Sequence, residues 1–197
     1  MKKYYLINLL FAYLLTFSIN AFSIDNIKVN TKASTVKWLG SKITESHSGT
    51  INIKSGNLLI NNGKLSGGNF VIDMTSIVNT DIESERGRKS IESHLKNEDF
   101  FDVDKYKTSS LKITKVNLLE DNHYKLEADL TIKGITHSIS FLADIKIKGN
   151  AFLATANIKI DRTKWGVTYK SGNVFKDLGD KAILDEIEFD IFLLSEK

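Results

Sequence analysis

Alternation between apolar and polar residues runs through most of this sequence and is the feature that most constrains its fold. The pattern begins past Ile24 and continues almost to the C-terminus. Its clearest runs span residues 124–132, 139–147, 154–160 and 187–193. A period of two puts successive side chains on opposite faces of a β-strand, so each run predicts a strand with one buried face. Turn sequences such as Asn61-Asn62-Gly63 and Lys148-Gly149-Asn150 separate the runs, which predicts about eight strands joined by tight turns.

The parity of the apolar residues switches at two points inside these predicted strands. One switch lies around Ser55-Gly56 and the other around Lys115. An extra residue at such a point forms a β-bulge, which bends the strand and helps a sheet to close. Closing the sheet also removes the exposed edges that a long open sheet would present. We therefore predict an all-β fold, a single antiparallel β-barrel of about eight strands.

Residues 81–97 depart from the strand pattern. The segment from Thr80 to Glu83 fits a capping box, and Ile91 and Leu95 lie four positions apart on one helical face. These features predict a short helical insertion that leads into Phe100-Phe101, although Gly87 and the charges around it argue against one continuous helix. Two placements stay open, because the helix can lie across one barrel mouth or cover an exposed apolar edge of the sheet.

The first 23 residues have the three-part pattern of a secretory signal peptide. Lys2 and Lys3 form a positive start, residues 6–17 are almost continuously apolar, and Ala21 and Ser23 place small residues before a possible cleavage site. An uncleaved membrane anchor is the alternative, but polar residues leave the run short of a comfortable bilayer span. We expect a signal peptide at 1–23 and an exported domain at 24–197 without stable membrane insertion after cleavage.

Charge and composition exclude several classes of function. The formal net charge is +3, and removal of Lys2 and Lys3 lowers it further, so the domain lacks the basic excess that neutralises nucleic-acid phosphates. The sequence has no cysteine, which excludes disulfides, thiolate metal sites and a cysteine nucleophile. No histidine has a second ligand at metal-binding spacing, so no metal or other cofactor is predicted. The four histidines are His47, His94, His123 and His137.

No catalytic constellation stands out either. His47 and Ser48 are adjacent, and adjacent residues on a strand point to opposite faces, so the pair does not form a nucleophile with its base. Carboxylate neighbours such as Asp185-Glu186 are interpreted as solvated turn charges. We predict no catalytic residues.

Arg162 shares the parity of Ile158 and Ile160 at the end of a predicted strand, which directs its guanidinium into the apolar interior. A buried charge needs a carboxylate or an anionic ligand group as its partner. We favour an internal ion pair with Asp161 or Asp185, and binding of a ligand head group is the alternative.

Small side chains recur at predicted inward positions among larger Leu, Ile and Phe residues. An eight-stranded barrel can hold one ligand if several of its inward side chains are small. Ordinary alternation of large and small residues that fits the taper of a packed barrel is the alternative. The small residues concerned are Ala128, Ala143, Ala154 and Ala156.

Several short motifs follow one another through nearly all of residues 27–193. They are Ser34-Thr35-Val36-Lys37-Trp38 with Gly40 and Lys42, His47-Ser48-Gly49, residues 70–77, His94-Leu95 with residues 99–103, residues 130–136, and Ile160-Asp161-Arg162 before Trp165-Gly166. In this ordered set the chain resembles the YceI-like polyisoprenoid-binding proteins. The resemblance implies a lipocalin-like antiparallel barrel with a helical insertion, exported to the bacterial periplasm, with an apolar tunnel for a polyisoprenoid chain such as a quinone tail.

We therefore expect the domain to bind, sequester or transport an isoprenoid lipid in the periplasm without catalysis. The predicted tunnel wall is Trp38, Phe70, Ile72, Leu95, Phe100, Phe101, Leu130, Phe141, Ala156 and Ile158. Two alternatives stay open. One is an enzyme that acts on a lipid at the barrel mouth through His94 or Arg162, and the other is an envelope interaction protein with a fully packed barrel.

Overall fold

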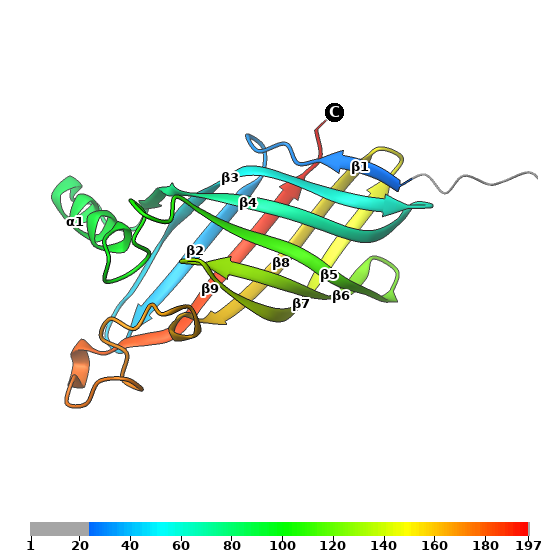
Figure 1. Ribbon diagram of the computed structural model, residues 1–197. Helices are drawn as coiled ribbons and strands as arrows, with labels where there is room; N and C mark the ends of the chain where they lie inside the picture. Colours follow the sequence, from blue (N-terminus) through cyan, green and yellow to red (C-terminus); the bar gives the residue numbers. More distant parts are fainter. Residues whose placement is uncertain (1–23, 197) are drawn as a thin grey trace, which may run out of the picture.

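The computed structural model describes residues 24–196, which form mainly antiparallel strands with one α-helix (Figure 1). The elements are β1 (Ile24–Lys28), β2 (Thr35–Lys42), β3 (Ser46–Asn61), β4 (Lys64–Asn79), α1 (Glu85–Lys96), β5 (Thr108–Glu120), β6 (His123–Ile132), β7 (Ile135–Lys148), β8 (Ala151–Asp161), the 3-10 turns η1 (Arg162–Trp165) and η2 (Gly179–Lys181), and β9 (Ile183–Leu194). The predicted signal peptide at 1–23 lies outside the described residues.

Strands β2 to β9 form a closed antiparallel barrel in which each strand pairs with the next along the chain. β9 returns to β2 and closes the ring, with Val36 opposite Ile191. The predicted barrel of about eight strands is confirmed. β1 is an additional strand that pairs with the second half of β3, where Ile27 lies opposite Leu58. It adds to the sheet beside the ring rather than within it.

The turns and bulges follow the local sequence. Asn62 and Gly63 both have positive φ, 50° and 74°, which is the backbone of a type I′ hairpin turn. The β3–β4 register shifts between Ile53 and Ser55, and the β5–β6 register shifts between Ile113 and Lys115. Both predicted bulges are therefore confirmed.

Helix α1 begins four residues later than the capping box predicted. Its N-cap is Ser84, whose hydroxyl accepts from the backbone N–H of Gly87 at 3.2 Å. The expected start at Thr80 is wrong because Asp81 bonds a distant strand, where it accepts from the backbone N–H of Ser48 at 3.1 Å. The helix lies at one end of the barrel, on the left in Figure 1, so the placement across a barrel mouth is confirmed. We call this end the mouth.

Strands β7 and β8 separate as they approach the mouth. They pair only over the stretch between the Ala143–Ala156 pair and the Lys148–Ala151 pair. Nearer the mouth, β7 pairs only with β6 and β8 pairs only with β9. Trp165 of η1 fills the interior beside this fork; it is 1% exposed, and its indole N–H donates to the carbonyl of Leu130 at 3.0 Å. No helix within residues 24–196 combines the length and apolar character needed to cross a bilayer.

Candidate functional site

The barrel encloses a cavity of about 510 Å³ that extends from the mouth deep into the interior. Its inner part is lined by apolar residues such as Ile145 and Leu193, and its outer part by α1 and the ends of β2, β8 and β9. A ligand site of this kind is concave, mostly apolar and preformed. The barrel is therefore not packed solid, in contrast to the alternative of an envelope interaction protein with a fully packed barrel.

Every residue of the predicted tunnel wall lines this one cavity. Trp38, Phe70, Ile72, Leu130, Phe141, Ala156 and Ile158 project from the strands, and Leu95, Phe100 and Phe101 come from α1 and the segment after it. The structure brings together residues that lie up to 120 positions apart between Trp38 and Ile158. Whether they contact a ligand stays a prediction.

Two glycines make room for the largest aromatic side chains of the wall. Gly49 lies opposite Trp38 on β3, and a Cβ atom at Gly49 would sit 2.6 Å from Cζ2 of the indole and 1.9 Å from the carbonyl of Val78. Gly56 lies opposite Phe70, and a Cβ there would sit 2.7 Å from Cδ1 of that ring. These contacts are too close for any side chain, so both rings occupy space that a side chain at the opposite position would need. The sequence reasoning missed this pairing.

Three of the four predicted small residues, Ala143, Ala154 and Ala156, line the cavity. Ala128 does not, although it is completely buried. It lies opposite Ile113 on one side and Ile139 on the other, and these larger side chains line the cavity in its place. The expectation that Ala128 helps to form the lumen is therefore wrong, while the small residues on β7 and β8 do keep space open.

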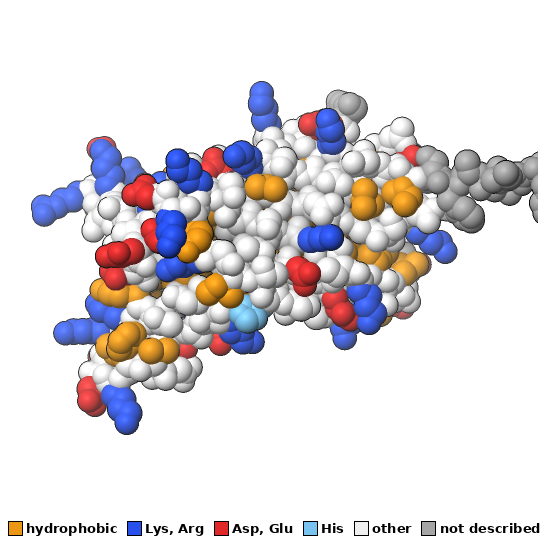
Figure 2. Space-filling model, in the orientation of Figure 1, with side chains coloured by type: hydrophobic (Ala, Val, Ile, Leu, Met, Phe, Trp, Pro, Cys, Tyr) orange, Lys and Arg blue, Asp and Glu red, His pale blue; other side chains and the backbone are white. Residues whose placement is uncertain are grey.

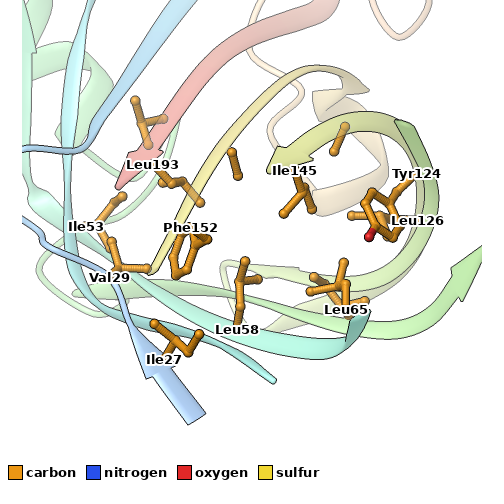
Figure 3. Packing of buried hydrophobic residues seen from close by; sticks show 14 of the residues in the cluster. Ile27, Val29, Ile53, Leu58, Leu65, Tyr124, Leu126, Ile145, Phe152 and Leu193 are labelled. Atoms are coloured by element: carbon orange, nitrogen blue, oxygen red, sulfur yellow. The ribbon is translucent and has the colours of Figure 1, made fainter. Parts of the chain in front are cut away.

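The barrel end opposite α1 is closed by tightly packed side chains (Figure 3). Val29, Leu58 and Phe152 point into the same interior and are 2%, 1% and 4% exposed. The chain after β1 crosses this end, because Val29 donates its N–H to Gly56 at 2.9 Å and Asn30 donates to Leu194 at 2.8 Å. A ligand therefore has no open path into the cavity from this side.

An aromatic cluster forms one side of the mouth. The ring of His94 on α1 meets Phe100 edge-on at 5.0 Å and Tyr169 edge-on at 4.6 Å between centroids. Nε2 of His94 also lies 3.4 Å from a carboxylate oxygen of Asp99. This cluster joins α1 to the segment after η1. Tyr169 was not predicted, because its role depends on a contact between two irregular segments.

Arg162 lies in the interior, as its parity predicted, and is 1% exposed. Its guanidinium donates to three backbone carbonyls: Nε to Leu184 at 3.1 Å, Nη1 to Val167 at 2.6 Å and Nη2 to Ile183 at 3.0 Å. Nη2 also lies 3.4 Å from Asp185. Burial lowers the pKa of the guanidinium and the Asp185 and Asp161 carboxylates oppose that shift, while an arginine stays charged at any ordinary pH.

The expected ion pair thus exists with Asp185, but backbone carbonyls supply most of the bonding. Asp161 does not contact the guanidinium; its carboxylate caps η1 by accepting from the backbone N–H of Thr163 at 3.0 Å and from its hydroxyl at 2.6 Å. Of the two expected partners, Asp185 is the one that pairs with Arg162. Arg162 ties the end of β8 to the start of β9, and its Cζ lies 6.0 Å from the centroid of Phe100.

A second polar group at the mouth was missed by the sequence reasoning. Asp81 accepts from Nδ1 of His47 at 3.0 Å and from the side-chain amide of Asn79. Burial raises the pKa of Asp81, but the hydrogen bonds from Ser48, His47 and Asn79 outweigh it, so the pKa lies below its ordinary value of 3.8. The group fastens the segment before α1 to the start of β3.

Polarity is distributed unevenly along the cavity. The charged or titratable residues that line it are Lys42, His47, His94 and Arg162, and all four lie at the mouth. In the wall, the indole N–H of Trp38 is buried and has no hydrogen-bond partner among residues 24–196. Within the same residues, no group of three His, Asp or Glu side chains is arranged to hold a metal ion. The arrangement suits an elongated apolar molecule with its polar end at the mouth.

Three solved structures share this architecture. BcnA from Burkholderia cenocepacia is 18% identical, with a TM-score of 0.69 over 85% of this chain and 99% of that chain. A polyisoprenoid binding domain from Saccharophagus degradans is 15% identical, with a TM-score of 0.62 over 88% and 99%. The YceI protein of Campylobacter jejuni is 20% identical, with a TM-score of 0.53 over 100% and 99%. At these identities the likeness shows the fold alone.

A search of curated proteins finds no match to the chain. The family model of the YceI-like domain, by contrast, matches residues 27–193, which is almost the whole of the barrel. The order of motifs seen in the sequence and the closed barrel with its insertion at the mouth agree with that match. The chain belongs to the family of YceI-like domains.

Proposed function

We propose that this protein binds one apolar isoprenoid lipid, such as a quinone or a polyprenyl chain, inside the barrel. The observation that carries the proposal is the preformed cavity of about 510 Å³, walled by aliphatic and aromatic side chains and closed at the end opposite α1. The solved polyisoprenoid binding domain from Saccharophagus degradans, which has the same fold, supports this class of ligand.

The wall provides affinity without a specific polar contact. Each CH₂ group of a lipid that leaves water contributes about 0.8 kcal/mol, so a branched hydrocarbon tail supplies most of the binding free energy. The aromatic faces of Trp38, Phe70 and Phe141 add broad contact area. Such a wall selects for length, width and apolarity rather than for a particular head group.

The polar end of the ligand lies at the mouth in this proposal. Lys42, His47 and His94 are there, and burying a polar head group among the aliphatic residues of the inner cavity is unfavourable. Arg162 keeps a structural role, because its guanidinium is already engaged by three carbonyls and Asp185. The protein acts by binding, as a carrier or store, and not as an enzyme.

We further propose that the protein works in the bacterial periplasm after removal of residues 1–23. The support is the cationic start, apolar run and small residues of the N-terminal segment. N-terminal sequencing of exported protein tests this directly. The proposal predicts a start near Ile24, and an intact Met1 on membrane-bound protein would contradict it.

Replacement of Ala156 by Phe tests binding in the cavity. The new ring fills empty space, so uptake of a polyprenol should fall strongly while stability changes little. Ala151→Phe is the matched control, because Ala151 is exposed on the same strand and does not line the cavity. Bound lipid is measured by mass spectrometry after solvent extraction. Equal uptake by both variants would overturn the proposal. It would also be overturned if Ala156→Phe lowered the free energy of unfolding by about 1–3 kcal/mol without reducing uptake, because that result indicates a packed site.

A further inference from the structure

The rim of the mouth exposes large apolar side chains to solvent. Ile43, Val174, Phe175 and Leu184 are 62%, 51%, 48% and 46% exposed. Single exposed apolar residues are common in soluble proteins, but a group of them at one place marks an interaction surface. We call these four residues the rim patch.

The rim patch comes from three chain segments that are joined side by side. Lys42, next to Ile43, lies opposite Ile183 in the β2–β9 pairing. Ser171, in the loop that carries Val174 and Phe175, forms a bridge with the same Ile183. The start of β9, with Leu184, therefore lies between the β2–β3 turn and the loop, at the lower left of Figure 1.

The tip that presents Val174 and Phe175 is built into the fold. Both backbone N–H groups donate to the carbonyl of Ser171, at 3.2 and 2.9 Å, and Ser171 is completely buried. The side chain of Asn173 donates to Asp185 at 2.7 Å, and Asp185 also contacts Arg162. The network around the buried guanidinium therefore holds these two apolar side chains outward.

The rim patch is continuous with the cavity. Leu184 is both exposed and part of the cavity lining, and Ile183 and Lys42 line it as well. An apolar path thus runs from the outer surface of the rim to the interior of the barrel. A lipid that followed it would pass from one apolar surrounding to another.

Unpaired lysines accompany the rim patch. Lys164, Lys170, Lys176 and Lys181 lie in the same loop region, and none of them forms an ion pair within residues 24–196. Asp177 and Asp180 lie in this loop as well, so its charge is mixed, with the lysines in excess. Figure 2 shows hydrophobic, basic and acidic side chains together on this lobe, at the lower left. Lysines at the edge of an apolar surface favour contact with anionic lipid head groups.

A second exposed apolar pair provides a comparison at the other end of the barrel. Leu118 and Leu119 are 45% and 57% exposed, but the next residues along the chain are Glu120 and Asp121. Lys125 and His123 lie across from this segment on β6, so the charge there is mixed. The closed end offers no route to the cavity, and access therefore distinguishes the two apolar surfaces.

We propose that the rim patch docks on the surface of a lipid bilayer that contains anionic lipids. Ile43, Val174 and Phe175 enter the head-group region, the lysines contact anionic head groups, and the mouth faces the bilayer. The isoprenoid ligand then moves between bilayer and cavity without crossing water. This inference rests on the proposed lipid-binding function for its purpose, but the docking itself is a separate property.

Co-sedimentation with vesicles of phosphatidylglycerol and phosphatidylethanolamine tests the proposal. The variant with Val174→Ser and Phe175→Ser should bind at least roughly tenfold more weakly than the unchanged protein, because two apolar side chains no longer leave water. The variant with Leu118→Ser and Leu119→Ser is the matched control and should bind normally. Replacement of Lys170, Lys176 and Lys181 by Gln should weaken binding to these vesicles and not to purely zwitterionic ones.

Equal binding by the two serine variants would overturn the proposal, as would no vesicle binding by the unchanged protein. Sedimentation velocity without vesicles tests whether the rim patch instead binds a second copy of the protein. A dimer that is present in the unchanged protein and absent in the Val174→Ser, Phe175→Ser variant would show this and would also overturn the proposal. Loading with polyprenol from detergent separates this inference from the proposed function. The same variant should load normally from detergent, whereas an unchanged protein that binds vesicles but never loads would refute lipid binding and leave docking supported.

Discussion

The two ends of the barrel are built in opposite ways. At the closed end, Val29, Leu58 and Phe152 are almost completely buried, and the chain after β1 crosses the opening. At the mouth, α1 has no fully buried residue, although Ile91, His94 and Leu95 face the cavity. Access to the cavity is therefore limited to the mouth side, and we expect local opening around α1 to cost less free energy than opening of the closed end.

The largest effect should follow from removing a side chain that packs the closed end. Phe152→Ala leaves a cavity beside Val29 and Leu58 and should lower the free energy of unfolding by about 3–5 kcal/mol, measured by urea denaturation. Phe175→Ala removes the same ring from the mouth, where it is 48% exposed, and should change stability by no more than about 0.5 kcal/mol. Similar losses in the two variants would contradict the division between the ends.

Some side chains near the mouth are fully buried, and Arg162 and Trp165 are each only 1% exposed. Arg162→Met leaves Asp185 and three carbonyls without their donor and should cost about 3 kcal/mol of stability. Arg162→Lys keeps the charge but lacks the planar set of donors, so it should recover only part of the loss.

Ligand binding by the same Arg162→Met variant sharpens this assignment. A neutral polyprenol should still bind, because the tail provides most of the affinity. Titration with an anionic isoprenyl phosphate is the contrasting measurement. Selective loss of the anionic ligand at an unchanged melting temperature would make Arg162 a head-group residue instead.

The smallest expected effect is that of acidic pH on the stability of the mouth around Asp81. The pKa of Asp81 in the folded protein lies below its ordinary value of 3.8, so its carboxylate stabilises the fold above that value. This contribution is lost as the pH falls from 3.8 through the lower folded-state pKa. The protection of the α1 amides, measured as hydrogen exchange relative to the intrinsic rate at each pH, should therefore fall at low pH in the unchanged protein, while that of the closed end responds less.

Asp81→Asn provides the control for this pH dependence. The amide cannot titrate, so protection of the α1 amides, relative to the intrinsic exchange rate, should be lower at neutral pH and should depend less on acid. If the substitution leaves the pH profile of α1 unchanged, the contact between Asp81 and β3 does not hold the mouth in place.

The fold could be predicted because its signals are local. Alternation defines buried faces, Asn62-Gly63 favours a tight turn, and the parity switches at Ser55 and Lys115 mark bulges. The start of α1 could not be located in this way. Asp81 completes a capping pattern in the sequence, but in the structure it bonds Ser48 and His47, which are more than thirty residues away.

The same limit applies to the site. Parity places Arg162 inside, yet it does not reveal that carbonyls of Val167, Ile183 and Leu184 receive its hydrogen bonds, since these come from irregular backbone. It also assigns Ala128 and Ala156 to the same inner face. Which of them borders empty space depends on their depth in the barrel and on the size of opposing side chains, and these are properties of the assembled fold.

A crystal structure of the protein saturated with a polyprenol would show directly whether the lipid lies inside the barrel. We expect one continuous chain there, in contact with Trp38 and Phe141, with its apolar end near Ile145 and Leu193 and its hydroxyl at the mouth. A polyprenol bound only on the outer surface, or one that entered the barrel through the end closed by Val29 and Phe152, would contradict this expectation.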